Sequence, residues 1–206
     1  MDCLLLVRHA ATAQTRRSRF PSTTGRALHD GCESLDDGGA AQARALRRHL
    51  PNADRCWSSL AVRATQTAQL AGFQPSPDAA LAECDFGAWA GMDLDEAHAA
   101  DPVGLAQWHA DPDSAPHGGE GLGDVRRRAA DVLSRAHALG GVTITFTHGG
   151  FVKAALLEIL DLPSRSVWRL DIAPTSVTEL RAADGTWRVA TLNWRPALRG
   201  AVAAAG

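Results

Sequence analysis

The stretch VTITFTHGG, residues 142–150, decides the fold class. Its first five residues are apolar or β-branched, which is typical of a buried strand, and the residues that follow predict a helix over about 151–160. Residues 3–9, CLLLVRH, again place a histidine directly after a short apolar run. In open sheets in which strands alternate with helices, ligands bind beyond the carboxyl ends of the strands. We therefore expect His9 and His148 to lie at one edge of the same sheet.

Further strands and helices are predicted on both sides of these two runs. Helices are expected near residues 36–49, 60–71, 93–100, 102–110 and 122–138, and strands at 54–58, 167–173, 176–182 and 187–193. Strand–helix alternation followed by terminal strands predicts a three-layer α/β/α sandwich with a mainly parallel central sheet. We expect one domain over residues 1–200, with lid-like segments at about 12–34 and 84–120 and a frayed tail at 201–206.

The composition is that of an ordinary soluble globular protein. The chain has 206 residues, of which 45% are apolar and 21% are charged, and its net charge is −2. This charge gives no indication of a nucleic-acid surface, and no stretch approaches the roughly 18 apolar residues of a membrane span. The N-terminus has no signal-peptide pattern, and the four cysteines are widely scattered. We therefore expect a cytoplasmic protein that binds neither nucleic acid nor membranes.

Two motifs place histidine and arginine where a phosphate could bind. Arg8 beside His9 could hold a pair of phosphate oxygens, although an isolated Arg-His pair is usually structural. Gly149 and Gly150 after His148 allow close backbone approach, and the helix that follows offers free N–H groups that favour an anion. A plain turn whose histidine only caps the helix fits the same residues.

Two further motifs add a cation and an acid. Arg63 lies one turn into a predicted helix that begins beside a strand end, so it could point into the same pocket, although exposed helical arginines are commoner. Glu83 and Asp85 lie among apolar residues, where a carboxyl group could donate a proton near neutral pH. A turn-forming acidic pair on a loop is the alternative interpretation.

The joint presence and order of these motifs resembles the histidine phosphatase superfamily, the phosphoglycerate mutase-like group. The similarity runs from Leu4 to about Asn193 and implies a phosphoglycerate mutase-like fold. It is carried by LLLVRHAAT (4–12), the helix pattern Leu35…Gly39…Gln42-Ala43…Leu46, SSLAVRATQTA (58–68), LAECDFGAWAG (81–91), HGGEG (117–121) and ITFTHGGFVKA (144–154).

The resemblance implies phosphoryl transfer in two steps. Neutral His9 would attack phosphorus and form a phosphohistidine, which water then hydrolyses. Arg8, Arg63 and His148 would hold the phosphoryl oxygens and stabilise the charge of the transition state. The resemblance implies no metal and no cofactor, because the arginines supply the positive charge.

The resemblance also implies a proton donor and two further phosphate contacts. Because His148 is followed by Gly149 rather than by Asp, proton donation falls to Glu83. Gly149 would contribute to substrate binding, and Thr15 would replace an Asn that touches phosphate in many relatives. Departures from the family pattern include Ala10 for Gly, Ala11 for Glu and Gly121 for Ser.

The expected substrate is a small-molecule phosphomonoester. No Lys or Arg occurs from Ala64 to Val125, a stretch with eleven acidic residues. Such a lid suits a neutral or polyol leaving group, with Phe86, Trp89 and Trp108 as stacking surfaces. Four arginines on the other flanking loop could instead meet a second anionic group, or form a solvated charge run. They are Arg16, Arg17, Arg19 and Arg26.

Two alternative functions stay open. A cofactor-dependent phosphoglycerate mutase-type phosphotransferase is disfavoured, because its relatives carry a longer basic insert after the donor Glu. A non-catalytic phosphate-binding module is disfavoured because His9, Glu83 and both arginines are kept, but Ala10 and Ala11 leave it open. A homodimer is also left open, although no apolar stripe in the sequence indicates one.

Overall fold

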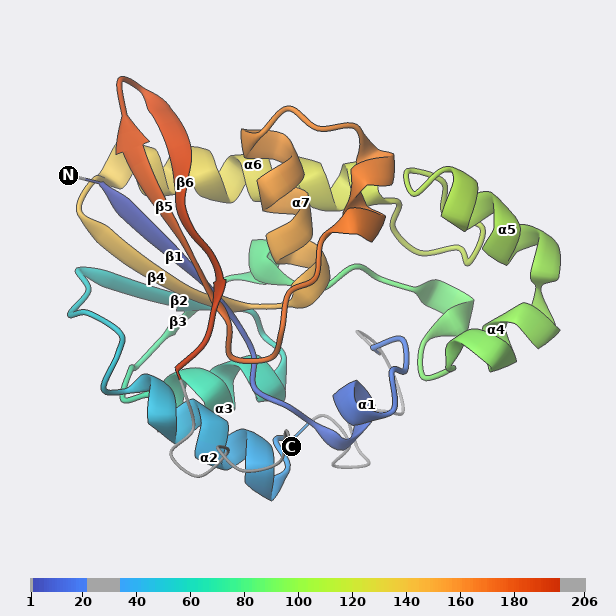
Figure 1. Cartoon of the computed structure of the whole chain (residues 1–206), viewed down its shortest axis with the longest axis horizontal. Helices are drawn as coiled ribbons and strands as arrows, with labels where there is room; N and C mark the ends of the chain where they lie inside the picture. Colours follow the sequence, from blue (N-terminus) through green and yellow to red (C-terminus); the bar gives the residue numbers. More distant parts are fainter. Residues whose placement is uncertain (1, 22–33, 197–206) are drawn as a thin grey trace, which may run out of the picture.

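A mixed six-stranded sheet forms the centre of the protein (Figure 1). The computed structural model describes residues 2–21 and 34–196. The strands lie in the order β3-β2-β4-β1-β5-β6. Their bounds are β1 Cys3–Arg8, β2 Arg55–Ser58, β3 Ser76–Pro77, β4 Val142–Thr147, β5 Val177–Ala183 and β6 Thr186–Trp194. The first four pair in parallel, whereas β5 and β6 join as an antiparallel hairpin, so the sheet is mainly parallel as predicted.

Helices cover both faces of this sheet (Figure 1). The side chains of β1 alternate between the faces, as the period of a strand requires. Leu4 and Leu6 belong to the apolar cluster that includes α6 and α7, whereas Leu5 and Val7 pack with α2 and α3. The bounds of these helices are α2 Asp37–Leu46, α3 Val62–Leu70, α6 Leu122–Leu139 and α7 Gly149–Ile159. The three-layer α/β/α architecture is therefore confirmed.

Two short helices lie beside the sheet rather than over a face. They are α4 (Leu94–Ala100) and α5 (Pro102–Ala110), and their bounds agree with the sequence to within one residue (Figure 1). Asp93 begins α4 with a capping box, and Asp101 accepts the N–H of Gly104 to begin α5. Short 3₁₀ turns at Ala79–Leu81 and Gly87–Trp89 precede them.

The predicted strand at 167–173 is wrong. Ser164–Arg169 instead form a 3₁₀ helix, η4, and β5 occupies the position beside β1. Val167 and Ile172 are nevertheless buried in the cluster around α7. Their apolar character reflects packing against a helix, which a short apolar run cannot distinguish from pairing in a sheet.

Two smaller differences concern the end of one helix and one short helix. Helix α2 begins after Asp36, which accepts the N–H of Gly39, and it ends at Leu46 rather than at residue 49. The polar region after His9 contains a short helix, α1 (Ala13–Arg16), where a loop was expected. The rest of that loop, residues 22–33, and the tail at 201–206 lie outside the described residues. Within the described ranges, no helix has both the length and the apolar character needed to cross a bilayer.

Candidate active site

The two histidines lie side by side at the carboxyl ends of neighbouring strands. β1 and β4 pair in parallel with Arg8 opposite Thr147, so the next residues, His9 and His148, leave the sheet together. The backbone N–H of His9 donates to the carbonyl of Thr147 at 2.8 Å. The ring centroids are 5.2 Å apart, with 62° between the ring planes. The strand assignment had predicted this juxtaposition.

The contacts of His9 determine its tautomer. Its Nδ1 lies 2.7 Å from the carbonyl oxygen of Ala10, and because a carbonyl only accepts, Nδ1 carries the proton. Arg63 Nε donates to His9 Nε2 at 3.3 Å, so Nε2 holds a lone pair. Burial and the charges of Arg63 and Arg8 hold the pKa of His9 well below its usual 6.5. His9 is therefore a neutral imidazole whose Nε2 can act as a nucleophile.

Arg63 joins the two histidines. The side chain is only 3% exposed, and burial lowers its pKa to about 10. Its Nη2 donates to Nδ1 of His148 at 3.1 Å, so the proton of His148 lies on Nε2, which donates to Ser59 Oγ at 2.7 Å. Burial, Arg63 and then His9 lower the pKa of His148 well below 6.5. Ser59 belongs to the SSLAVRATQTA segment, but its role as partner of His148 was not predicted.

Arg8 reaches the same place from the end of β1. One Nη donates to the carbonyl of Ile172, which fixes the guanidinium plane. Its Nε is buried, and no acceptor for it exists among the described residues. Burial lowers the pKa of Arg8, and the negative charge of Glu83 opposes that shift. An arginine N–H without an acceptor is suited to a phosphoryl oxygen.

Glu83 faces the N-terminus of α7. Its Oε1 accepts the N–H of Cys84 at 3.0 Å, and its Oε2 accepts the N–H of Gly150 at 3.1 Å. The carboxylate is almost buried, with 9% of the residue exposed. The sequence analysis expected the free N–H groups at the start of this helix to bind phosphate. In the structure, the N–H of Gly150 donates to Glu83 instead.

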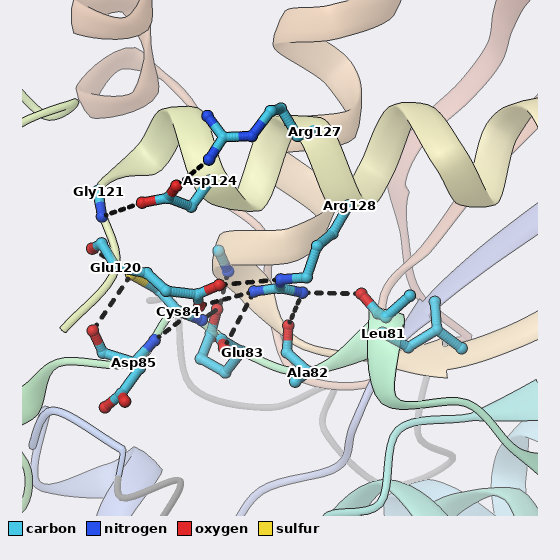
Figure 2. Close-up of polar contacts among 12 residues, drawn as sticks. Leu81, Ala82, Glu83, Cys84, Asp85, Glu120, Gly121, Asp124, Arg127 and Arg128 are labelled. Carbon is cyan, nitrogen blue, oxygen red and sulfur yellow. Dashed lines mark hydrogen bonds and ion pairs between the residues drawn. The ribbon is translucent and has the colours of Figure 1, made fainter.

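A partly buried ion pair between Arg128 and Glu120 holds the loop that carries Glu83 (Figure 2). Arg128 on α6 donates to both carboxylate oxygens of Glu120, at 3.0 and 2.8 Å. The same guanidinium donates to the carbonyls of Ala80 at 2.7 Å and Ala82 at 3.0 Å. Glu120 in turn accepts the N–H of Asp85 at 3.1 Å. The sequence matched Glu120 to a motif without giving it a role, and nothing in the pattern of α6 distinguishes Arg128 from its neighbours.

Replacing Gly150 by alanine should misplace Glu83 and lower kcat/KM by about 10²-fold, since displacements near 1 Å can cost this much. A Cβ at Gly150 would lie 2.2 Å from Glu83 Oε1. Steady-state kinetics on a phosphate ester would measure the loss. Gly149→Ala is the matched comparison, because its Cβ would lie 3.4 Å from Arg8 Cζ, an ordinary contact. Equal losses in both variants would contradict the assigned role of Gly150.

These side chains open into a cavity of about 490 Å³. Arg8, His9, Arg63 and Glu83 line it, and Thr15 lies opposite with its hydroxyl 2.9 Å from that of Thr12. The structure thus brings together five of the seven predicted site residues at one cavity. His148, 1% exposed, lies behind Arg63, and Gly149 lines an adjoining recess. Within the described ranges, no His, Cys, Asp and Glu side chains group in a way that could hold a metal ion.

Two of the four arginines of the flanking loop already have carboxylate partners. Arg16 pairs with Asp36 at 2.6 Å, and Arg19 pairs with Glu96 at 2.8 Å. Both line the cavity, whereas Arg17 is exposed and does not. Arg26, the fourth, lies outside the described residues. The two arginines that line the cavity are therefore already paired with carboxylates of the protein.

The aromatic residues expected to stack on substrate have different positions. Phe86 and Trp108 line the adjoining recess, but Trp89 is 2% exposed and lines neither cavity. Trp89 packs instead against Phe20 and His117, with ring centroids 5.7 and 4.9 Å away. The expectation that Trp89 is a stacking surface is therefore wrong, because its ring is part of a small apolar cluster.

The departures at Ala10 and Ala11 fit the site without strain. Ala10 is fully buried, its φ lies outside the left-handed region, and its N–H donates to Thr67 Oγ1 at 3.0 Å. The backbone of this segment instead comes close to Gly39, where an added Cβ would lie 2.0 Å from the carbonyl oxygen of Ala11. The backbone here therefore needs no glycine at Ala10.

Comparison with known proteins places this arrangement in a family. A bifunctional protein of Mycobacterium tuberculosis is 32% identical over 201 residues, which cover 92% of this chain and 53% of that protein. The chain thus spans about half the length of that relative. A 2,3-bisphosphoglycerate-dependent phosphoglycerate mutase of Methylobacterium radiotolerans is 32% identical over 188 residues, which cover 82% of this chain and 84% of the mutase.

A solved structure agrees with these sequence matches. The complex of a mycobacterial glucosyl-3-phosphoglycerate phosphatase with VO3 matches with a TM-score of 0.79 and 26% identity, and covers 94% of this chain and 99% of that chain. The sequence pattern of the histidine phosphatase superfamily (branch 1) matches residues 4–195. The chain belongs to branch 1 of the histidine phosphatase superfamily, the phosphoglycerate mutase-like group.

Proposed function

We propose that the protein hydrolyses a small-molecule phosphomonoester through a phosphohistidine on His9. The observation that carries this proposal is the tautomer of His9, whose Nδ1–H donates to the carbonyl of Ala10 and leaves a lone pair on Nε2. In this structure that lone pair accepts the N–H of Arg63 at the edge of a cavity that both residues line. Arg8 and Arg63 supply two guanidinium groups at the same place, and Glu83 supplies a carboxyl group. A nucleophile, an anion site and an acid within one cavity are the parts that phosphoryl transfer needs.

In the first step, His9 Nε2 attacks phosphorus in line with the ester oxygen. The N–P bond forms while the bond between phosphorus and the alcohol oxygen breaks, and the protonated Glu83 carboxyl gives its proton to the leaving alkoxide. Arg8 and Arg63 stabilise the three phosphoryl oxygens in the transition state. The Nδ1–H of His9 stays hydrogen-bonded to the carbonyl of Ala10 throughout. This hydrogen bond stabilises the positive charge that the ring acquires.

In the second step, water attacks the phosphohistidine. The Glu83 carboxylate takes a proton from this water, the N–P bond breaks, and inorganic phosphate leaves with neutral His9 restored. His148 has both ring nitrogens engaged by Arg63 and Ser59. In this proposal it keeps Arg63 in position and turns toward phosphate only when a ligand draws Arg63 away.

Phosphate release from a panel of phosphomonoesters, with product isomers followed in parallel, tests the proposal against the mutase alternative. We expect release of inorganic phosphate in the presence of chelator, and a burst of protein-bound phosphate that is stable in alkali, labile in acid and maps to the His9 peptide. Isomerisation of 3-phosphoglycerate without net phosphate release would favour a mutase. A protein that never becomes labelled by any phosphate ester would favour the non-catalytic module.

A further inference from the structure

A second recess of about 250 Å³ adjoins the phosphoryl site. Arg8, Glu83 and Pro21 line both cavities, so the recess begins where the proposed proton donor stands. A phosphoryl group held at His9 would place its ester oxygen near Glu83, and the alcohol beyond that oxygen would enter the recess. The volume is below the range of about 300–1,000 Å³ that suits drug-sized ligands, so it fits a compact group.

The wall of the recess is mainly apolar and aromatic. Trp108 and Trp168 meet edge to face with ring centroids 4.6 Å apart, and Phe86 lies 6.1 Å from Trp108. Leu122 and Ile172 also line this wall. Rings of this kind pack well against a flat, apolar body.

Besides Arg8, a second cation lies among these apolar side chains. Lys153, the single lysine of the chain, lies on α7 three residues after Gly150, so both residues share a face of the helix. It lines the recess, and burial lowers the pKa of its ammonium group, although Asp171 and Glu83 oppose the shift. Within the described residues, no hydrogen bond or ion pair engages Lys153. By contrast, Arg16 and Arg19 are paired with carboxylates.

We propose that this recess binds the leaving group of the substrate, and that this group is a compact, flat alcohol that carries a carboxylate for Lys153. Asp171 lines the same recess, and its charge opposes the lowering of the pKa of Lys153, but among the described residues neither it nor any other side chain forms a hydrogen bond or ion pair with the ammonium group. A half-buried ammonium group without a hydrogen-bond partner gains most from an anion that brings its own charge and hydrogen-bond acceptors. The cation-free stretch from Ala64 to Val125 predicted a neutral leaving group, but Lys153 enters the recess from α7, outside that stretch. The inference rests on the proposed function, since it assumes that phosphoryl transfer takes place at His9.

Two aryl phosphates of nearly the same shape, one with a carboxylate and one with a neutral carboxamide, test the inference. We would measure kcat/KM for 4-carboxyphenyl phosphate and for 4-carbamoylphenyl phosphate, and compare the ratio of the two within each protein. The wild type should prefer the carboxylate by about tenfold or more, as expected for a hydrogen bond between charged groups. Lys153→Met should bring the ratio close to one, and Lys153→Arg should keep most of the preference. The ratio cancels any general loss of activity in a variant.

A ratio near one in the wild type, or a preference that survives in Lys153→Met, would overturn the inference. Binding of 4-hydroxybenzoate and 4-hydroxybenzamide in the presence of inorganic phosphate, followed by calorimetry, gives a readout that needs no turnover. Tighter binding of the benzoate in the wild type alone supports the recess even if both esters stay intact. Intact esters would count against the proposed function, whereas equal binding of the two alcohols would count against Lys153.

Discussion

Replacing His9 by alanine is expected to lower kcat for phosphate-ester hydrolysis by about 10⁴-fold or more, because it removes the imidazole that accepts the phosphoryl group in the proposed mechanism. Two neighbouring groups hold this imidazole in place. The carbonyl of Ala10 accepts a hydrogen bond from Nδ1 of His9, and Arg63 donates to Nε2 of His9. The lowered pKa of His9 keeps Nε2 unprotonated even below pH 6.5, so protonation of this ring should not limit the rate at neutral pH.

Steady-state phosphate release measures this loss, and protein labelling shows whether the covalent step has disappeared with it. His49→Ala is the matched control, since His49 is exposed and packs against Trp194, away from the cavity. It should keep wild-type turnover. Full turnover in His9→Ala, with a native circular dichroism spectrum, would mean that the phosphoryl group passes directly to water and that the covalent mechanism is wrong.

The core of this site could be predicted because it depends on strand ends. The apolar runs before His9 and His148 are short and unambiguous, and parallel pairing of neighbouring strands brings their ends to one edge. Arg63 follows from the same rule, since its helix starts just after β2 on the other side of β4. Local sequence therefore carries enough information to bring together the proposed nucleophile and the proposed anion site.

The parts that could not be predicted depend on contacts between distant segments. Arg128 is one of three successive arginines on α6, and only the tertiary structure shows that it reaches the carbonyl oxygens before Glu83. Lys153 is one turn beyond Gly149 and Gly150, yet the recess that it shares with Trp168 depends on how η4 packs. The error at residues 167–173 has the same origin, because burial against a helix and burial in a sheet leave the same apolar pattern.

The loss of kcat/KM in Glu83→Gln is expected to depend on how strongly the leaving group of the substrate requires protonation. For an alkyl phosphate, kcat/KM should fall by about 10³-fold, within the range typical of general acid catalysis. For 4-nitrophenyl phosphate the fall should be small, because its phenolate leaves without protonation and kcat/KM reports only the transfer to His9. Hydrolysis of the phosphohistidine still needs a base, so labelled protein should accumulate in the variant during a single turnover.

The glutamine keeps the shape of the side chain, and its oxygen can still accept one of the two backbone N–H groups that bind Glu83. Asp85→Asn is the control on the same loop, because Asp85 Oδ1 accepts the N–H of Gly87 at 2.9 Å and its side chain lines neither cavity. It should leave the dependence on the leaving group unchanged. Equal losses for both esters in Glu83→Gln would show that Glu83 positions the substrate without donating a proton. A selective loss in Asp85→Asn would transfer the role of the acid to that residue.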